Sequence, residues 1–180
     1  MNFVRAKLPV LIAALAALLV AAFPARADDW ILTGVGTRVK TIAFVDIDVY
    51  EISHFVKQAP ASKSKQEMIN ADVHKKLAWK MLRDVDKEKI QDALKGAFAS
   101  NNYKDAAKIG AFLGAFTGEL KEGSRVSIVY DADKKSTTVT VGGGGSATVA
   151  GVDFMKGVWS IWFGNIDQPK LGDQLLSRLK

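Results

Sequence analysis

The segment LTGVGTRVKTIAFVDIDVYEI, residues 32–52, shows the clearest alternation of apolar and polar side chains in the chain. β-Branched residues recur at every second position from Val45 to Val49. The positions between and after them carry polar or aromatic side chains: Asp46, Asp48 and Tyr50. A period of two places successive side chains on opposite faces of a strand. The segment therefore predicts one long β-strand with one apolar face.

Beyond this segment, the hydrophobic period switches between that of a strand and that of a helix. Period two predicts a strand at 75–82, a hairpin at 124–141 and a short strand at 147–151. Apolar residues at helical spacing predict helices at 86–102, about 105–121, 152–164 and from Pro169 onward. The GGGGS run at 142–146 lacks the Lys-Ser/Thr of a phosphate loop, so we expect a flexible connection. The order of elements argues for an α+β fold, an antiparallel β-sheet with helices packed on it.

The first 27 residues predict a signal peptide. A short basic start precedes an apolar run of 16 residues, Leu8–Phe23, where a membrane span needs about 20. The triplet Ala25-Arg26-Ala27 has the small-x-small pattern of a signal peptidase site. We expect cleavage after Ala27, a single domain at 28–180 that is periplasmic or secreted, and no membrane span after processing. The alternative is a retained membrane anchor.

Composition narrows the possible partners and chemistry. Without the signal peptide, 22 basic and 19 acidic residues leave a formal net charge of +3, with no basic stripe interleaved with aromatics. Nucleic acid is therefore not an expected partner. The chain has no cysteine, which removes disulfides and thiolate chemistry. We expect its two histidines, His54 and His74, to be solvated rather than metal ligands, and we find no motif for a cofactor.

Arg38 is the residue with the sharpest functional interpretation. It follows Gly34 and Gly36 at the start of the predicted strand, and glycines allow close backbone approach or a bulge. Without a bulge, Arg38 shares a face with Asp46 and Asp48, and an ion pair there is purely structural. A buried arginine without a partner costs several kcal/mol, so a buried Arg38 requires a carboxylate from the protein or from a ligand.

The layout as a whole resembles the chalcone isomerase family over nearly the whole chain after the signal peptide. The resemblance rests on GVGTR (34–38), FVDIDVY (44–50), KKLAWKMLRDVDKEKIQDAL (75–94), LKEGSRVSIVY (120–130) and WSIWFGNIDQPKLGDQLLSRL (159–179). It implies an open-faced sandwich of an antiparallel sheet covered by helices, which agrees with the fold expected from periodicity. It also implies that Arg38, in the Gly-x-Gly-x-Arg stretch, holds the substrate or ligand.

The other catalytic positions that the resemblance implies carry no matching side chain. The family threonine corresponds to Val45, and the tyrosine, asparagine and late Ser/Thr fall near Asp86, Ala93 and Ile161. Among the tyrosines, only Tyr103 is expected to approach the site, from a helix end. Closing a phenolate onto an enone needs donors aimed at the developing enolate. Flavonoid cyclisation is therefore not expected.

The resemblance includes a fatty-acid-binding branch in which an arginine grips a carboxylate beneath an apolar cavity. We therefore expect this chain to bind a small apolar or amphipathic carboxylate, without a cofactor. The expected ligand-binding residues are Arg38, Tyr103, Val45, Trp159 and Trp162, with Phe98 and Phe112 as further candidates for the apolar wall. Core packing is the alternative role of the apolar residues. Two other functions stay open: an intramolecular lyase or isomerase with a rebuilt site, and a structural or interaction domain in which Arg38 pairs with Asp46 or Asp48.

Overall fold

Six strands form one antiparallel sheet in the computed structural model, which describes residues 29–179. Neighbours in the sheet follow one another along the chain, from β1 at one edge to β6 at the other. The strands are β1 (Ile31–Ile42), β2 (Val45–Val56), β3 (Lys75–Met81), β4 (Arg125–Asp131), β5 (Ser136–Val141) and β6 (Ser146–Ala150). The predicted signal peptide lies outside the described residues.

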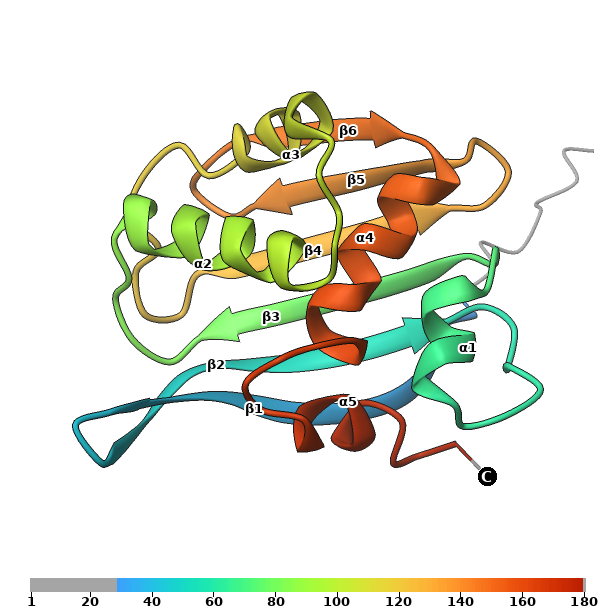
Figure 1. Ribbon diagram of the computed structural model, residues 1–180, viewed down its shortest axis with the longest axis horizontal. Coiled ribbons are helices and arrows are strands. Elements are labelled where there is room, and N and C mark those ends of the chain that lie inside the picture. The colour runs from blue at the N-terminus through green and yellow to red at the C-terminus, as the bar shows by residue number, and fades with distance from the viewer. Residues whose placement is uncertain (1–28, 180) are drawn as a thin grey trace, which may run out of the picture.

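Five helices lie over one face of this sheet (Figure 1). They are α1 (Lys65–Asn70), α2 (Lys87–Ser100), α3 (Ala106–Leu113), α4 (Val152–Phe163) and α5 (Lys170–Gln174). The predicted α+β class, with helices packed on an antiparallel sheet, is confirmed. No helix in the described part of the chain is long and apolar enough to cross a membrane.

The core lies between the sheet and the helices. Alternate residues of the strands face it and are buried, as in Leu77, Trp79 and Met81 of β3. Helix α4 crosses the middle of the sheet (Figure 1) and buries most of its side chains, including Trp159 and Trp162 with no exposed surface. No helix of residues 29–179 lies on the opposite face of the sheet, and many side chains there are partly exposed.

Three predicted elements differ from the structure. Helix α3 ends at Leu113 instead of near residue 121, because Gly110, Gly114 and Gly118 disfavour a long helix and Leu120 pairs with Val85 in a β-bridge. Helix α1 lies in a segment for which no helix was predicted. The GGGGS run is a hairpin turn held by backbone hydrogen bonds such as Gly145 N to Ala115 O at 2.9 Å, so the expectation of a flexible connection was wrong.

The expected long strand at 32–52 is two strands, β1 and β2, joined by a two-residue turn at Ala43 and Phe44. Both turn residues have positive φ, 47° and 66°. Such turns favour Asn-Gly or other residues that tolerate this conformation. The prediction of one strand was wrong because the sequence places alanine and phenylalanine there, and neither signals a turn.

Candidate ligand-binding site

A cavity of about 620 Å³ lies between the β1–β2 end of the sheet, helix α2 and the end of α4. Helix α2 supplies an apolar wall: Ile90, Ala93, Leu94 and Ala97. The other walls come from β1 and β2 and from the end of α4 with its following loop: Arg38, Ile47, Val49, Tyr50, Ile161, Trp162, Ile166 and Asp167. Arginine and apolar side chains thus line one cavity.

A bulge in β2 brings Tyr50 to the cavity side, beside Arg38. Arg38 lies opposite Tyr50 and Val39 lies opposite Asp48, so Val49 has no partner on β1. One extra residue reverses the alternation along a strand. Arg38 therefore shares the cavity side with Val49 and Tyr50, whereas Asp46 and Asp48 are exposed on the other face. The parity expected for an unbroken strand was wrong because the chain reverses at Ala43 and Phe44, so that Arg38 lies on β1 and Asp46 and Asp48 pair with Thr41 and Val39 of its other face.

Arg38 is held by residues that follow α4. Its Nη2 donates to Asp167 Oδ1 at 2.6 Å, and its Nη1 donates to Gln168 Oε1 at 3.2 Å and to the Val39 carbonyl at 2.9 Å. The side chain is only 16% exposed. The alternative of a pair with Asp46 or Asp48 is contradicted, since Asp167 is the carboxylate in contact and Asp46 accepts from Thr41.

Gln168 fixes the backbone on both sides of Arg38. Its Nε2 donates to the Thr37 carbonyl at 2.8 Å, and its Oε1 accepts from the Val39 amide at 2.9 Å. The Thr37 carbonyl and the Val39 amide are backbone groups of edge strand β1 that a further strand would otherwise hydrogen-bond. The carboxamide thus satisfies the strand edge and orients Arg38 at the same time.

Glycines bring helix α5 and the following turn against β1. A Cβ placed on Gly34 would lie 2.2 Å from the Gln174 carbonyl oxygen and 2.4 Å from the Leu175 carbonyl carbon. At Gly36 the nearest atoms are the ends of side chains, with Leu171 Cδ1 at 2.6 Å. Gly34 therefore allows the backbone of β1 to lie against the backbone at Gln174 and Leu175. This contact positions the strand that carries Arg38.

Tyr50 and Trp162 form one wall of the cavity together. The Tyr50 hydroxyl accepts from Trp162 Nε1 at 3.0 Å, and its ring stacks on Trp79. Burial raises the pKa of Tyr50 against the opposing effects of the Trp162 hydrogen bond and the Arg38 charge. The hydroxyl is therefore protonated at neutral pH and has a proton to donate. Tyr50 was not predicted from the sequence because the bulge at Val49 reverses its face, and Tyr103 was predicted instead.

Of the five expected ligand-binding residues, Arg38 and Trp162 line the cavity. Val45 lies near the tip of the β1–β2 hairpin and is 61% exposed. Tyr103 packs on Phe98 and Phe154 and donates to Asp153 at 2.9 Å, away from the cavity. Trp159, like Phe98 and Phe112, is in the core and has no exposed surface. The alternative role in core packing describes these last three residues.

A family model described as chalcone isomerase-like matches residues 19–177. The chain belongs to the chalcone isomerase-like family. The crystal structure of the fatty-acid binding protein AtFAP1 from Arabidopsis thaliana is similar to it, with a TM-score of 0.67 and 16% sequence identity. The match covers 83% of this chain and 88% of that chain, and at this identity it shows a shared fold. No curated protein sequence matches the chain.

Two positions that the family resemblance assigned to catalytic donors do lie on the cavity wall of this chalcone isomerase-like chain. They are near Ala93 and Ile161, and both of those residues line the cavity. Neither side chain has a polar atom. These positions therefore extend the apolar surface where the resemblance implied hydrogen-bond donors.

His54 is buried, so the expectation of two solvated histidines was wrong for this residue. Trp159 Nε1 donates to His54 Nε2 at 3.0 Å, which places the ring proton on Nδ1, 2.7 Å from the Thr33 hydroxyl. Thr33 in turn donates to the Leu175 carbonyl at 2.7 Å. Burial, with a contribution from the Lys75 charge, lowers the pKa of His54 to about 3. The neutral ring thus links α4 and β2 to the segment after α5.

Lys75 is a second buried polar residue that the alternation along β3 did not single out. Its Nζ donates to the Met68 carbonyl at 2.6 Å and lies 4.8 Å from the centroid of the Trp159 ring. Burial lowers its pKa to about 7 in spite of the nearby Asp72 charge. Because its amine is bonded to the end of α1, Lys75 attaches this short helix to the sheet.

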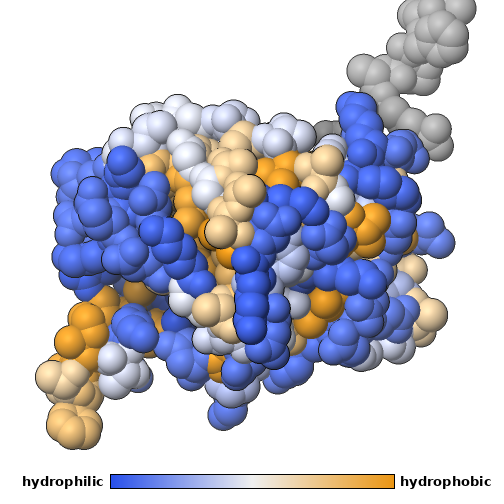
Figure 2. Space-filling model, turned by 45° about the horizontal axis from the view of Figure 1, so that its top comes forward, coloured by the Kyte–Doolittle hydropathy of each residue, from blue (hydrophilic) through white to orange (hydrophobic). Residues whose placement is uncertain are grey.

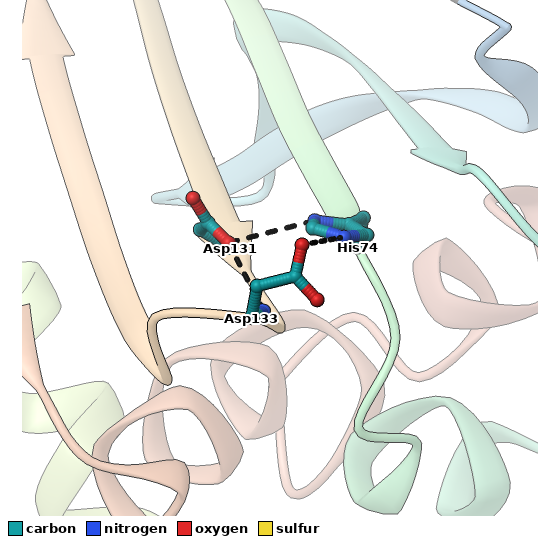
Figure 3. A group of neighbouring side chains, drawn as sticks. All are labelled: His74, Asp131 and Asp133. Carbon is teal, nitrogen blue, oxygen red and sulfur yellow. Dashed lines mark hydrogen bonds and ion pairs between the residues drawn. The ribbon is translucent and has the colours of Figure 1, made fainter.

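His74 lies beside Asp131 and Asp133 at the β4–β5 turn (Figure 3). Histidine and aspartate side chains are common metal ligands. Its Nδ1 faces Asp131 at 3.8 Å, whereas its Nε2 faces Asp133 at 3.4 Å. One metal ion binds only one nitrogen of an imidazole ring, and these carboxylates lie beside different nitrogens. Asp131 also accepts the amides of Asp133 and Lys134, which is the arrangement of a capped turn.

Proposed function

We propose that this chain is a non-catalytic binding protein for a small amphipathic carboxylate, such as a fatty acid. One observation carries the proposal: Arg38, 16% exposed, stands on the wall of an otherwise largely apolar cavity. A guanidinium binds a carboxylate through paired, charge-assisted hydrogen bonds. The apolar wall would receive the acyl chain.

The size and lining of the cavity suit this class of ligand. Ligand pockets typically enclose about 300–1,000 Å³ and combine apolar walls with a few polar groups, and this cavity measures about 620 Å³. Leu94 and Ile90 of α2 lie across the cavity from strand β2. Tyr50 supplies a hydroxyl donor near the arginine for a second hydrogen bond to the ligand head.

A bound ligand carboxylate would replace Asp167 as the partner of the Arg38 guanidinium. The Asp167 carboxylate also accepts from Lys40 Nζ at 3.0 Å. When a ligand takes the place of Asp167 at Arg38, Asp167 keeps its pair with Lys40 and is not left as an unpaired charge. The exchange therefore avoids the main cost of breaking an ion pair.

Apolar residues at the former donor positions favour binding over cyclisation. Ala93 and Ile161 offer no hydrogen bond to a developing enolate, and each missing donor removes about 2.7–4 kcal/mol of transition-state stabilisation. We place the protein in the periplasm or outside the cell, on the basis of the predicted signal peptide. Amino-terminal sequencing of the protein isolated from its cells should then begin at Asp28.

Binding of a fatty acid and of the fatty alcohol with the same chain length tests the ligand class. Arg38→Met removes the charge and keeps much of the packing volume, so we expect carboxylate affinity to fall about 10–100-fold, with alcohol affinity little changed. Lys108→Met is the control, because Lys108 pairs with Asp153 away from the cavity. Equal affinity of wild type and Arg38→Met for the fatty acid would refute the proposal.

A further inference from the structure

The β1–β2 hairpin ends in an apolar tip that extends beyond the rest of the sheet (Figures 1 and 2). Ile42 and Val45 are 58% and 61% exposed, and Phe44 is fully exposed. Among the described residues, five large hydrophobic side chains are exposed, and these are three of them. Leu82 is a fourth, and its amide bonds to Val49 at the same end of the sheet. Exposed apolar side chains are therefore concentrated at this end.

The backbone of the tip is unfavourable for its own sequence. Ala43 and Phe44 both have positive φ, where glycine and asparagine are favoured and a bulky side chain is disfavoured. Full exposure of Phe44 means that no packing within the described residues compensates for this conformation. An Asn-Gly turn would form the same hairpin with less strain. The fold itself thus gives no reason for a phenylalanine at this point.

The tip is continuous with the cavity. Ile42 and Lys40, on the same side of β1 as Arg38, both line it. From the tip inward, the chain therefore presents an exposed aromatic residue, then the cavity mouth, then the arginine. A chain-like apolar ligand that enters beside Ile42 reaches the α2 wall along apolar surface.

The charges of the cavity lining suit a lipid surface. It carries four cations, Arg38, Lys40, Arg83 and Lys89, and two anions, Asp84 and Asp167. Lysine and arginine next to inserted apolar side chains are attracted by anionic headgroups. A stable protein partner typically covers about 800 Å² per side, whereas this feature is a narrow projection. The form and charge together favour a bilayer as the occupant.

We propose that the tip of the β1–β2 hairpin inserts into the surface of an anionic lipid bilayer and places the cavity mouth against it. Docking itself stands without the proposed ligand. Its role, which is passage of an acyl chain between bilayer and cavity, rests on the proposed function.

Flotation with vesicles of phosphatidylcholine and phosphatidylglycerol tests the docking. The variant Ala43→Asn/Phe44→Gly removes the aromatic side chain and relieves the turn, so it should unfold at the same or higher denaturant concentration than wild type. We expect it to bind vesicles at least tenfold more weakly. Ile31→Thr is the matched control, because Ile31 is also exposed, at the other end of β1. It should bind vesicles like wild type.

Three outcomes would overturn the docking proposal: no vesicle binding by wild type, equal binding by the turn variant, or equal loss in Ile31→Thr. Cross-linking of the tip to a protein, with no vesicle binding, would also overturn it and assign the tip to a protein partner. Transfer of a fluorescent fatty acid from vesicles tests the role of the docking. The turn variant should slow transfer at least tenfold while its affinity for fatty acid in solution stays at the wild-type value. If the vesicle-binding results are as expected but the wild type binds no fatty acid, the proposed function is rejected and the docking proposal stands.

Discussion

The guanidinium of Arg38 and the carboxylate of Asp167 are in contact at 2.6 Å on the wall of the cavity. Burial of Asp167 opposes its ionisation, but the hydrogen bond from Lys40 and the charge of Arg38 outweigh it and lower its pKa. Asp167 is therefore ionised at neutral pH. The Asp167 carboxylate therefore binds the Arg38 guanidinium, which the proposed ligand would also need to bind.

Asp167→Asn should increase the affinity for a fatty acid about three- to tenfold. The amide forms a weaker hydrogen bond with Arg38 than the carboxylate does, so the ligand meets less competition. The gain is modest because Asp167 is half-exposed and its pair with Arg38 is partly screened. Isothermal titration would measure it, with Asp173→Asn as the control for an exposed ion pair outside the cavity. Weaker binding by Asp167→Asn would mean instead that Asp167 holds Arg38 in its binding position.

Gln168→Leu should weaken binding of the fatty acid and leave binding of the fatty alcohol nearly unchanged. The substitution removes one acceptor from Arg38 and leaves the Val39 amide and Thr37 carbonyl without their partner. We expect a loss of about 1–2 kcal/mol in the free energy of unfolding. The two affinities and a urea titration would be measured together. Equal losses for acid and alcohol would show that Gln168 supports the cavity as a whole and not the arginine in particular.

Gly34→Ala should destabilise the protein far more than Gly36→Ala. The new Cβ at position 34 meets backbone atoms of Gln174 and Leu175, which move only if the segment after α5 moves. We expect a loss of about 3 kcal/mol in the free energy of unfolding. At position 36 the Cβ meets the ends of the Leu171 and Gln174 side chains, which can rotate, so the change should stay within about 1 kcal/mol. Denaturant unfolding of the two variants would compare them, and equal losses would contradict the close approach at Gly34.

His54 should make the protein less stable as the pH falls below 6.5. The pKa of His54 is lowered from 6.5 to about 3 in the folded protein, so in this window the unfolded chain binds a proton that the folded chain does not. The contribution of His54 to stability is therefore fully present above the pKa of the unfolded state and is lost as the pH falls toward the folded pKa. The loss reaches about 1.4 kcal/mol per pH unit.

Unfolding free energies of wild type and His54→Gln between pH 4.5 and 7 would isolate this contribution. Aspartate and glutamate residues titrate in both proteins, so the difference between the two slopes belongs to His54. We expect the wild type to lose about 2 kcal/mol more than the variant across this range. Parallel slopes would mean that His54 is protonated in the folded state or reaches solvent.

Local signals were sufficient for the sheet and helix classes and for singling out Arg38, which lines the cavity. Alternation along β3 and the apolar stripe of α2 depend only on neighbours within one element, so the pattern predicts them. The turn at Ala43 and Phe44 was missed because it uses residues that carry no turn signal. Tyr50 was missed because one extra residue, Val49, reverses the strand face, and single-sequence alternation does not register a bulge.

Long-range contacts explain the remaining differences. Asp167 and Gln168 lie 129 and 130 residues from Arg38 along the chain, and no local pattern links such positions. His54 resembles any isolated histidine in the sequence, and only Trp159 and Thr33 on either side of it make it a buried, neutral ring.

The sequence by itself determined the family and the α+β class, and it singled out Arg38 after two glycines as the candidate ligand-binding residue. It could do so because periodicity and short motifs are properties of contiguous residues. The tertiary structure decided which carboxylate Arg38 meets, which tyrosine faces the cavity, and that an apolar tip stands at its mouth. The physical reason is that these depend on strand register, bulges and packing of distant segments. Each of them moves a side chain from one face to another without leaving a local trace in the sequence.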